Sequence, residues 1–243
     1  MDNVGYVGLS AQVALRRQLD VIANNVANMN TVGFKGSRSV FAEALRKFGP
    51  STRDEVSFVI DKGTYIDFSA GPLNATGSSL DAAIDGEGFF RVQTPEGQFY
   101  TRDGRFARDP EGRLVTVTGH RVLDDGGAEI MIPPNARDID IGLDGGVSVD
   151  GVFVARIGVY RFEEPHRLTQ RGDLLFAPAD GQAAIPVDGP RIVQGMVEGS
   201  NVQSVIEIAR LIEVTRAYER SEQAISQADA LMKDSATRIG RVA

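Results

Sequence analysis

The amino-acid sequence predicts an α+β protein in which two terminal helices flank an antiparallel all-β middle region. Apolar residues recur at coiled-coil spacing near the N-terminus, and a longer heptad pattern occupies the C-terminus. Between them, Gly- and Asp-containing turns separate segments of alternating apolar residues. We therefore expect residues 1–35 and 200–243 to pair as one coiled-coil-like inner domain. Residues 36–79 are expected to form an extended connecting segment, and residues 80–199 a β-rich outer domain.

The N-terminal helix is predicted by a narrow apolar seam. Its members recur at spacings of four, three, four and three residues, as in a coiled coil: Leu15, Leu19, Ile22, Val26 and Met29. Asparagine is a poor helix former, yet Asn25 lies beside this seam, where its amide can hydrogen-bond to another helix and fix the register. Gly33 suits the left-handed position that follows a helix terminus, so we expect the helix to stop there.

The C-terminal helix is predicted by an uninterrupted heptad repeat. Large residues recur every seven positions: Leu211, Tyr218, Ile225, Met232 and Ile239. A second row, three residues later, consists of smaller residues: Val214, Ser221, Ala228 and Ser235. A helix over residues 202–238 would be about 55 Å long at the usual rise per residue. So long a helix with so thin an apolar stripe predicts contacts outside a compact core.

The middle of the chain has the pattern of an antiparallel β protein. Residues 36–79 contain short strand-like pieces, such as GTYIDF, and little that could form a core. From residue 80 onward, alternating segments such as GFFRVQT are separated by Gly-containing turns every 8 to 12 residues. This spacing is typical of a sandwich or barrel.

The composition limits the possible classes of function. The chain has 243 residues, a formal net charge of -7 and no cysteine. The acidic charge and the lack of a Lys/Arg cluster argue against nucleic-acid binding, and disulfide or thiolate chemistry is excluded. No apolar run has the length of a membrane span, and the N-terminus does not resemble a secretory signal peptide. On these grounds alone, a cytoplasmic location would be expected.

Candidate catalytic and metal sites are not supported by the sequence. His120 and His166 are the only histidines, and neither has a partner at metal-ligand spacing. The acidic residues of DIDIGLD do not match a calcium loop. No nucleophile elbow, P-loop or dinucleotide fingerprint occurs. We therefore expect no catalytic residue, no cofactor and no metal ion.

Three blocks of the sequence together resemble a known family. ANNVANMNTVGFK, at residues 23–35, is similar to the N-terminal signature of the rod and hook group of bacterial flagellar axial proteins. LDAAIDGEGFFRV and YTRDGRFARDPEGRLVTVTG resemble the middle signature of that group, and QGMVEGSNV with RLIEVTRAYE its C-terminal signature. Within the group, the short length and the opening MDNVGYVGLSAQVALRRQLDVIANN are most similar to a proximal rod subunit. A distal rod subunit or a hook-type protein is the alternative.

The resemblance implies a structural subunit without enzymatic activity. Members pair their terminal helices, polymerise helically around an export channel and transmit torque from the motor to the hook. The implied partners are copies of the chain, other proximal and distal rod proteins, and transiently the flagellar type III export apparatus. Export without a cleaved signal peptide implies a basal-body rod location crossing the periplasm, which replaces the cytoplasmic expectation. A secreted β-domain glycan-binding protein or hydrolase is the alternative of a different class, and the absence of Trp disfavours it.

The residues expected to serve assembly lie in the two helices and in the turn that follows the first helix. Inter-subunit packing is expected from the seam residues of the first helix together with Asn25. It is also expected from the C-terminal seam residues, which are Leu211, Val214, Tyr218, Ile225, Ala228, Met232 and Ile239. The signature turn is expected to comprise Thr31, Gly33, Phe34 and Lys35.

Overall fold

The structure, a computed structural model, describes residues 2–47 and 55–239. The chain divides into two compact units, here called unit 1 and unit 2. Unit 1 consists of Met1–Ala27, Ser37–Tyr65 and Gln203–Ala243, and unit 2 of Asn28–Gly36 and Ile66–Val202. The chain therefore crosses between the units four times, after residues 27, 36, 65 and 202.

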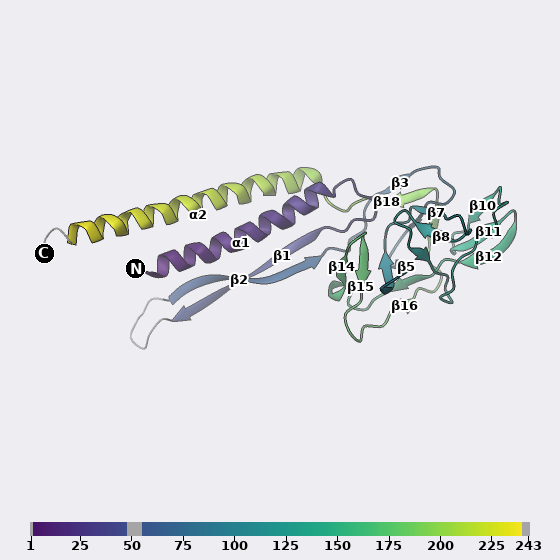
Figure 1. Cartoon of the computed structure of the whole chain (residues 1–243), viewed down its shortest axis with the longest axis horizontal. Helices are drawn as coiled ribbons and strands as arrows, with labels where there is room; N and C mark the ends of the chain where they lie inside the picture. The colour runs from purple at the N-terminus through teal and green to yellow at the C-terminus, as the bar shows by residue number, and fades with distance from the viewer. Residues whose placement is uncertain (1, 48–54, 240–243) are drawn as a thin grey trace. The chain divides into compact units, whose positions relative to one another are not determined.

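Unit 1 consists of two long helices and a two-stranded sheet. Helix α1 spans Asp2–Ala27 and helix α2 spans Ser204–Ile239. Strands β1 (Ser37–Lys47) and β2 (Glu55–Ile66) pair with each other. Helix α1 packs against both α2 and β1, and Figure 1 shows the two helices side by side. The predicted α+β class with paired terminal helices is confirmed.

The two helices of unit 1 run antiparallel. Gly8, near the start of α1, lies against Ile225 in the second half of α2. Asn25, near the end of α1, hydrogen-bonds to Glu207 in the first turn of α2. A Cβ atom at Gly8 would lie only 2.7 Å from Cγ1 of Ile225, so glycine allows the helices to approach closely there.

The expected connecting segment, residues 36–79, contains β1, β2 and the short strand β3 (Leu73–Ala75). The β1 sequence SRSVFAEALRK includes good helix formers, which mask a strand in a sequence pattern. The partner strand and the helix against which β1 packs favour the extended conformation over local propensity.

Unit 2 is built from short antiparallel strands, as the sequence predicts. The largest sheet has nine strands. They are β5 (Phe89–Thr94), β6 (Gly97–Thr101), β7 (Phe106–Arg108), β8 (Leu114–Thr116), β9 (Arg121–Val122), β13 (Val159–Arg161), β14 (Thr169–Arg171), β15 (Leu175–Ala177) and β16 (Ile185–Pro186). A short 3₁₀ helix, η1 (Pro165–Arg167), precedes β14.

Three smaller sheets complete unit 2. The strands β10 (Ile139–Ile141), β11 (Gly146–Val149) and β12 (Val152–Arg156) form an antiparallel sheet in that order. Strand β17 (Ile192–Gln194) pairs with β4 (Ala82–Ile84), and β18 (Met196–Glu198) pairs with β3. The last two pairings join the end of the β region to its beginning.

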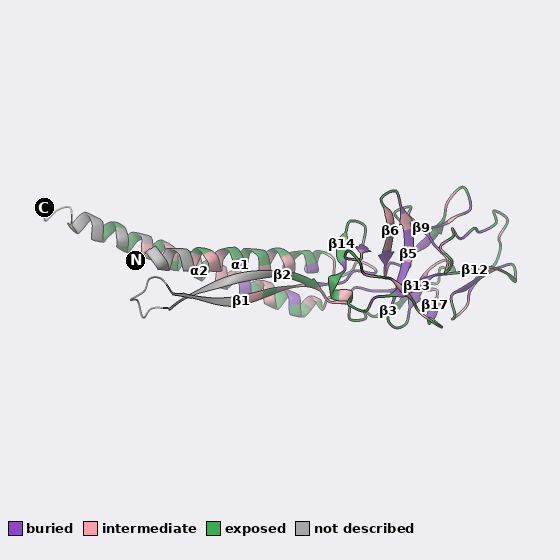
Figure 2. Cartoon of the chain, turned by 90° about the horizontal axis from the view of Figure 1, so that it is seen from below, coloured by how far each residue is buried: buried purple, intermediate pink, exposed green. Residues whose placement is uncertain are grey.

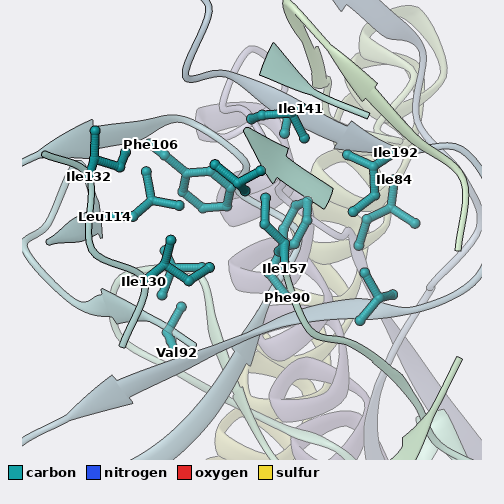
Figure 3. Packing of buried hydrophobic residues seen from close by; sticks show 14 of the residues in the cluster. Ile84, Phe90, Val92, Phe106, Leu114, Ile130, Ile132, Ile141, Ile157 and Ile192 are labelled. Atoms are coloured by element: carbon teal, nitrogen blue, oxygen red, sulfur yellow. The ribbon is translucent and has the colours of Figure 1, made fainter. Parts of the chain in front are cut away.

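Two apolar clusters form the core of unit 2. The larger one gathers aliphatic and Phe side chains from several sheets, and Figure 3 shows part of it: Ile84, Phe90, Val92, Phe106, Leu114, Ile130, Ile132, Ile141, Ile157 and Ile192. The smaller one is aromatic and contains Tyr100 and Phe162, whose ring centroids lie 4.8 Å apart in an edge-to-face arrangement. Burial of this apolar area stabilises the fold of unit 2.

Candidate assembly and junction sites

The predicted seam residues lie on covered faces of the two helices. Ile22, Asn25 and Val214 are buried within the single chain. The other described seam residues are half-buried: Leu15, Leu19, Val26, Met29, Leu211, Tyr218, Ile225 and Ala228. The side chains of Met232 and Ile239 lie outside the described residues. Gly8 extends the α1 seam by one heptad, and the sequence pattern missed it because glycine carries no apolar side chain.

Apolar side chains away from the seam are exposed. On α2, Val205, Ile208 and Ile212 follow one another at spacings of three and four residues, so they share one face. We call these three residues the exposed row. On α1, Leu9 and Val13 are also exposed and four residues apart. Figure 2 shows exposed residues along both helices. Spacings of three and four residues are those of a heptad, and the apolar run VIEIARLIEV signals a second apolar face of this helix.

Asn25 is a buried polar residue that contacts both α2 and β1. Its Nδ2 donates hydrogen bonds to the Ser37 carbonyl oxygen at 2.8 Å and to Glu207 Oε2 at 3.4 Å. Its Oδ1 accepts a hydrogen bond from the Ser37 N–H at 2.9 Å. Glu207, also buried, accepts from Arg210 Nη1 at 2.7 Å and lies 3.8 Å from Arg38 Nη1. The Asn25 amide thus reaches another helix, α2 of the same chain, and also fixes the start of β1.

Helix α1 ends at Ala27, earlier than the sequence suggested. The prediction that Gly33 immediately follows the helix end is therefore wrong. Turn hydrogen bonds replace helical ones after Ala27: the Thr31 N–H donates to the Asn28 carbonyl at 3.1 Å, and Thr31 Oγ1 donates to Asn28 Oδ1 at 3.2 Å. Short polar side chains of this kind compete with helical hydrogen bonds.

The signature turn belongs to unit 2 and is closely packed. Gly33 does have a left-handed conformation, with φ of +71°. A Cβ atom there would lie 2.6 Å from the backbone nitrogen of Asp103, so space as well as conformation requires glycine. The Gly33 N–H donates to the Glu198 carbonyl oxygen at 2.7 Å, and Phe34 and Lys35 are buried.

Lys35 and Arg102 share the buried carboxylate of Glu198. Lys35 Nζ lies 2.6 Å from Glu198 Oε1, and Arg102 Nη1 lies 3.0 Å from Glu198 Oε2. Lys35 Nζ also donates to the Ser69 carbonyl at 2.7 Å, and Arg102 Nη2 to the Gly86 carbonyl at 2.9 Å. The exposed fractions of Lys35, Arg102 and Glu198 are 0%, 5% and 1%. We call these three residues the triad.

Burial determines the electrostatics of the triad. Desolvation lowers the pKa of Lys35 and that of Arg102, while the Glu198 carboxylate acts in the opposite direction on both. A buried cation without a partner is strongly unfavourable, so removing one member of such a group destabilises the fold. Glu198 therefore makes the burial of both cations possible.

Three segments next to the unit crossings are tied to one another around Glu198. Its Oε1 accepts a hydrogen bond from the Gly71 N–H at 2.8 Å. Asn201 Oδ1 accepts from the Gly36 N–H at 2.8 Å, and Asn201 Nδ2 donates to the Asp67 carbonyl at 2.7 Å. We call residues 28–36, 66–72 and 198–202 the junction segments. One carboxylate and one amide therefore connect all three.

Three family models match the chain in sequence order. The model described as "Flagella basal body rod protein" matches residues 6–35, and "Flagellar hook protein FlgE/F/G D1 domain" matches residues 83–149. "Flagellar basal body rod FlgEFG protein C-terminal" matches residues 193–239. The flagellar basal-body rod protein FlgF of Caulobacter vibrioides is 44% identical over 100% of both chains. The chain belongs to the FlgF-like family of flagellar basal-body rod proteins.

Other relatives place this FlgF-like rod protein within its group. FlgF of Mesorhizobium japonicum is 40% identical, with 91% of each chain covered. FlgG of Bacillus subtilis is 34% identical, covering 94% of this chain and 96% of the relative. The FlgG likeness shows a related member of the same group. The family resemblance seen in the sequence is confirmed, and the protein is a structural subunit of the flagellar basal-body rod.

The triad of this FlgF-like rod protein takes one residue from each matched region. Lys35 lies in the first, Arg102 in the second and Glu198 in the third. Contacts between distant regions of a chain leave no local sequence pattern, and for this reason the sequence did not reveal the triad. The only trace was that Lys35, Arg102 and Glu198 each fall within one of the three family signatures.

Features suited to other functions are few in the part of the chain that the structure describes. There, no group of three or more His, Cys, Asp and Glu side chains is placed to hold a metal ion. No helix over the same residues is both long and apolar enough to span a lipid bilayer.

Proposed function

We propose that this rod protein is a proximal rod subunit that polymerises helically around the export channel and transmits torque from the motor to the hook. The observation that carries the proposal is the exposed row on a paired terminal helix of a flagellar rod protein. An apolar row on a long helix is stabilised when a neighbouring helix covers it. The full-length likeness to FlgF proteins, at 44% and 40% identity, favours the proximal over the distal position.

The contacts between subunits are proposed to use both apolar faces of the helices. The exposed row remains accessible in the single chain, and the seam residues Tyr218 and Ile225 are only half-buried. Leu9 and Val13 are further exposed apolar residues, on α1. In the rod, the terminal helices form the inner layer and the β-rich unit forms the outer layer.

The proposed partners and location follow from this role. The subunit assembles with copies of itself and with other proximal and distal rod proteins, and it meets the type III export apparatus transiently. It is exported without cleavage of a signal peptide and resides in the part of the rod that crosses the periplasm. It has no enzymatic activity.

Substitutions on α2 test the proposal. In a strain that lacks the chromosomal copy, Ile208→Asp and Ile212→Asp should abolish incorporation into basal bodies and motility, because a charge replaces an apolar contact. Tyr218→Asp tests the seam in the same way. The matched control is Ala224→Asp, which adds the same charge on a different, exposed face of α2. Motile cells with normal basal bodies for all three test variants would contradict the proposed interface.

The proposed lack of enzymatic activity has its own test. Purified protein is incubated with peptidoglycan, and the supernatant is examined for soluble fragments by chromatography. We expect none above a heat-inactivated sample. Release of fragments by the folded protein would instead support the glycan hydrolase alternative.

A further inference from the structure

Residues 192–202 close one end of unit 2, and we propose that they act as a closing strap. The strap comprises β17, β18 and the residues up to Val202. The signature turn and the segment 66–72 acquire their fixed structure only when the strap docks, so the three junction segments order as one cooperative group. This inference concerns how the subunit completes its fold, and it does not depend on which rod position the subunit takes.

The strap contacts segments that lie far away in the sequence. Strand β17 pairs with β4, and β18 pairs with β3. The side chains of Glu198 and Lys35 form an ion pair although they are 163 residues apart in the sequence. The Asn201 side chain bonds to the Gly36 backbone, 165 residues away. Long-range contacts of this kind form late, because closing a long loop has an entropic cost that only the finished contact offsets.

The signature turn depends on the strap because the strap carries the carboxylate that balances the charge of Lys35. Without Glu198, Lys35 and Arg102 would be two buried cations that repel each other, and Arg102 does lower the pKa of Lys35. Two other acids raise these pKa values less than Glu198 does: Asp67 for Lys35 and Glu87 for Arg102. Lys35 is therefore expected to remain hydrated, with the signature turn open, until the strap supplies the carboxylate.

The segment 66–72 depends on the strap through direct backbone contact. The Gly199 N–H donates to the Pro72 carbonyl at 2.8 Å. A Cβ atom at Gly71 would lie 2.1 Å from the Gly199 carbonyl oxygen, so the two glycines touch with no side chain between them. Asn201 adds hydrogen bonds from its Nδ2 to the Asp67 and Ser69 carbonyls. Glu198, Gly199 and Asn201 of the strap thus all form hydrogen bonds with residues 66–72.

The strap is also anchored in the core of unit 2. Ile192 of β17 is fully buried within the larger apolar cluster, and Val197 of β18 is also buried. These anchors add an apolar driving force for docking that is independent of the triad. Since a chain is made from its N-terminus, an incomplete chain lacks the strap and leaves its signature turn open.

Hydrogen exchange on the full-length protein tests the strap. The test variant is Glu198→Gln, which keeps the side-chain shape but cannot balance two cations. The matched control is Glu129→Gln, which removes a carboxylate that pairs with Arg121 at the surface. Exchange is followed by mass spectrometry for peptides covering 28–36, 66–72 and 192–202, with the core strand β5 as an internal reference.

We expect the Glu198→Gln variant to exchange at least about ten-fold faster in all three segments, by a common factor, while the control matches the native protein. Faster exchange in 192–202 alone, with 28–36 still protected, would overturn the proposal, as would unchanged exchange in all three. If Glu198→Gln unfolds unit 2 altogether, Asn201→Ala is tested instead, and the same outcomes support or overturn the proposal. That variant removes hydrogen bonds to Gly36 and Asp67 and leaves the triad intact.

Discussion

Lys35 and Glu198 form an ion pair with an Nζ to Oε1 distance of 2.6 Å, although both side chains are almost completely removed from solvent. A buried ion pair adds little net stability, because desolvation of the two charges offsets their attraction. Its effect appears when one partner is lost and the other remains buried alone. The pair therefore specifies the path of the signature turn more than it strengthens the fold, and it makes the turn sensitive to substitution.

The first prediction concerns the triad. Lys35→Met leaves Glu198 with only Arg102 as counter-ion and removes the bond to the Ser69 carbonyl, so unit 2 should lose about 3 kcal/mol of unfolding free energy. Urea unfolding followed by near-UV circular dichroism of the aromatic cluster measures this loss. Arg121→Met is the control, since it removes a surface pair and should change stability by about 1 kcal/mol or less. Equal losses in the two variants would contradict the special role of the buried pair.

The second prediction concerns Gly33 and separates the effect of its left-handed backbone conformation from the effect of steric crowding. Gly33 and Gly77 have nearly the same φ, +71° and +73°, but only Gly33 lacks room for a Cβ atom. Gly77→Ala should therefore destabilise by about 1–2 kcal/mol through backbone strain alone. Gly33→Ala should cost about 1–3 kcal/mol more, because the backbone of Asp103 must move. Urea midpoints measure the difference, and indistinguishable midpoints would show that the crowding is relieved elsewhere.

The third prediction concerns the close approach of the helices at Gly8. Glycine to alanine within a helix normally stabilises by about 1 kcal/mol. Here the new methyl group would meet Ile225, so Gly8→Ala should destabilise unit 1 in the native background. In an Ile225→Ala background the methyl group has room, and the same change should be stabilising. Thermal unfolding followed at 222 nm gives the four values of this cycle, and an effect of the same sign in both backgrounds would rule out the contact.

The fourth prediction concerns the amide of Asn25. Asn25→Asp replaces a donor to Glu207 with a second carboxylate and should lower the stability of unit 1 by about 2 kcal/mol near pH 7. The loss should shrink as the pH falls, because protonation of either carboxyl removes the repulsion. Gln223→Glu is the matched control, because it also turns an amide into a carboxylate, at an exposed position of α2, and should have little effect. Thermal unfolding at pH 4 and pH 7 distinguishes the two variants.

The fifth prediction concerns alkaline stability. Burial raises the pKa of Tyr100 above its usual value of 10.0. The folded state therefore favours the neutral phenol, and the associated stability is present below pH 10 and is lost as the pH rises through the raised pKa. Tyr100→Phe removes this contribution while keeping the ring. Above pH 10, the unfolding free energy of the native protein should fall relative to that of Tyr100→Phe, and a constant difference between them would contradict the shift.

The helices were predictable because their periodicity is local. The spacing from Leu15 to Met29 and the heptads from Leu211 onward indicate amphipathic helices without knowledge of the fold. The structure confirms paired terminal helices, although α1 ends at Ala27, before Met29. The antiparallel β unit was predictable from its regularly spaced turns. Gly33 was correctly expected to be left-handed, but its partner in space, Asp103, could not be inferred.

The candidate site was much less predictable, because its contacts join distant parts of the chain. Lys35 and Arg102 reach Glu198 across 163 and 96 positions, and no periodic pattern records such distances. Similarly, nothing local indicates that Asn25 bonds to the first residue of β1. The exposed row was more accessible to sequence reasoning. The thin apolar stripe of a long helix already predicts that apolar residues such as Ile208 and Ile212 are incompletely covered, and the structure adds which face of α2 the chain itself covers.

Strand β18 is only three residues long, so its backbone pairing with β3 could slip along the partner with little change in hydrogen bonding. Sliding by two positions keeps the same face but would put Met196 or Ser200 opposite the two buried cations. Neither side chain carries a negative charge, so both misaligned pairings are excluded electrostatically. The Glu198 carboxylate thus selects one register for β18, a strand too short for its backbone pairing to fix the register alone.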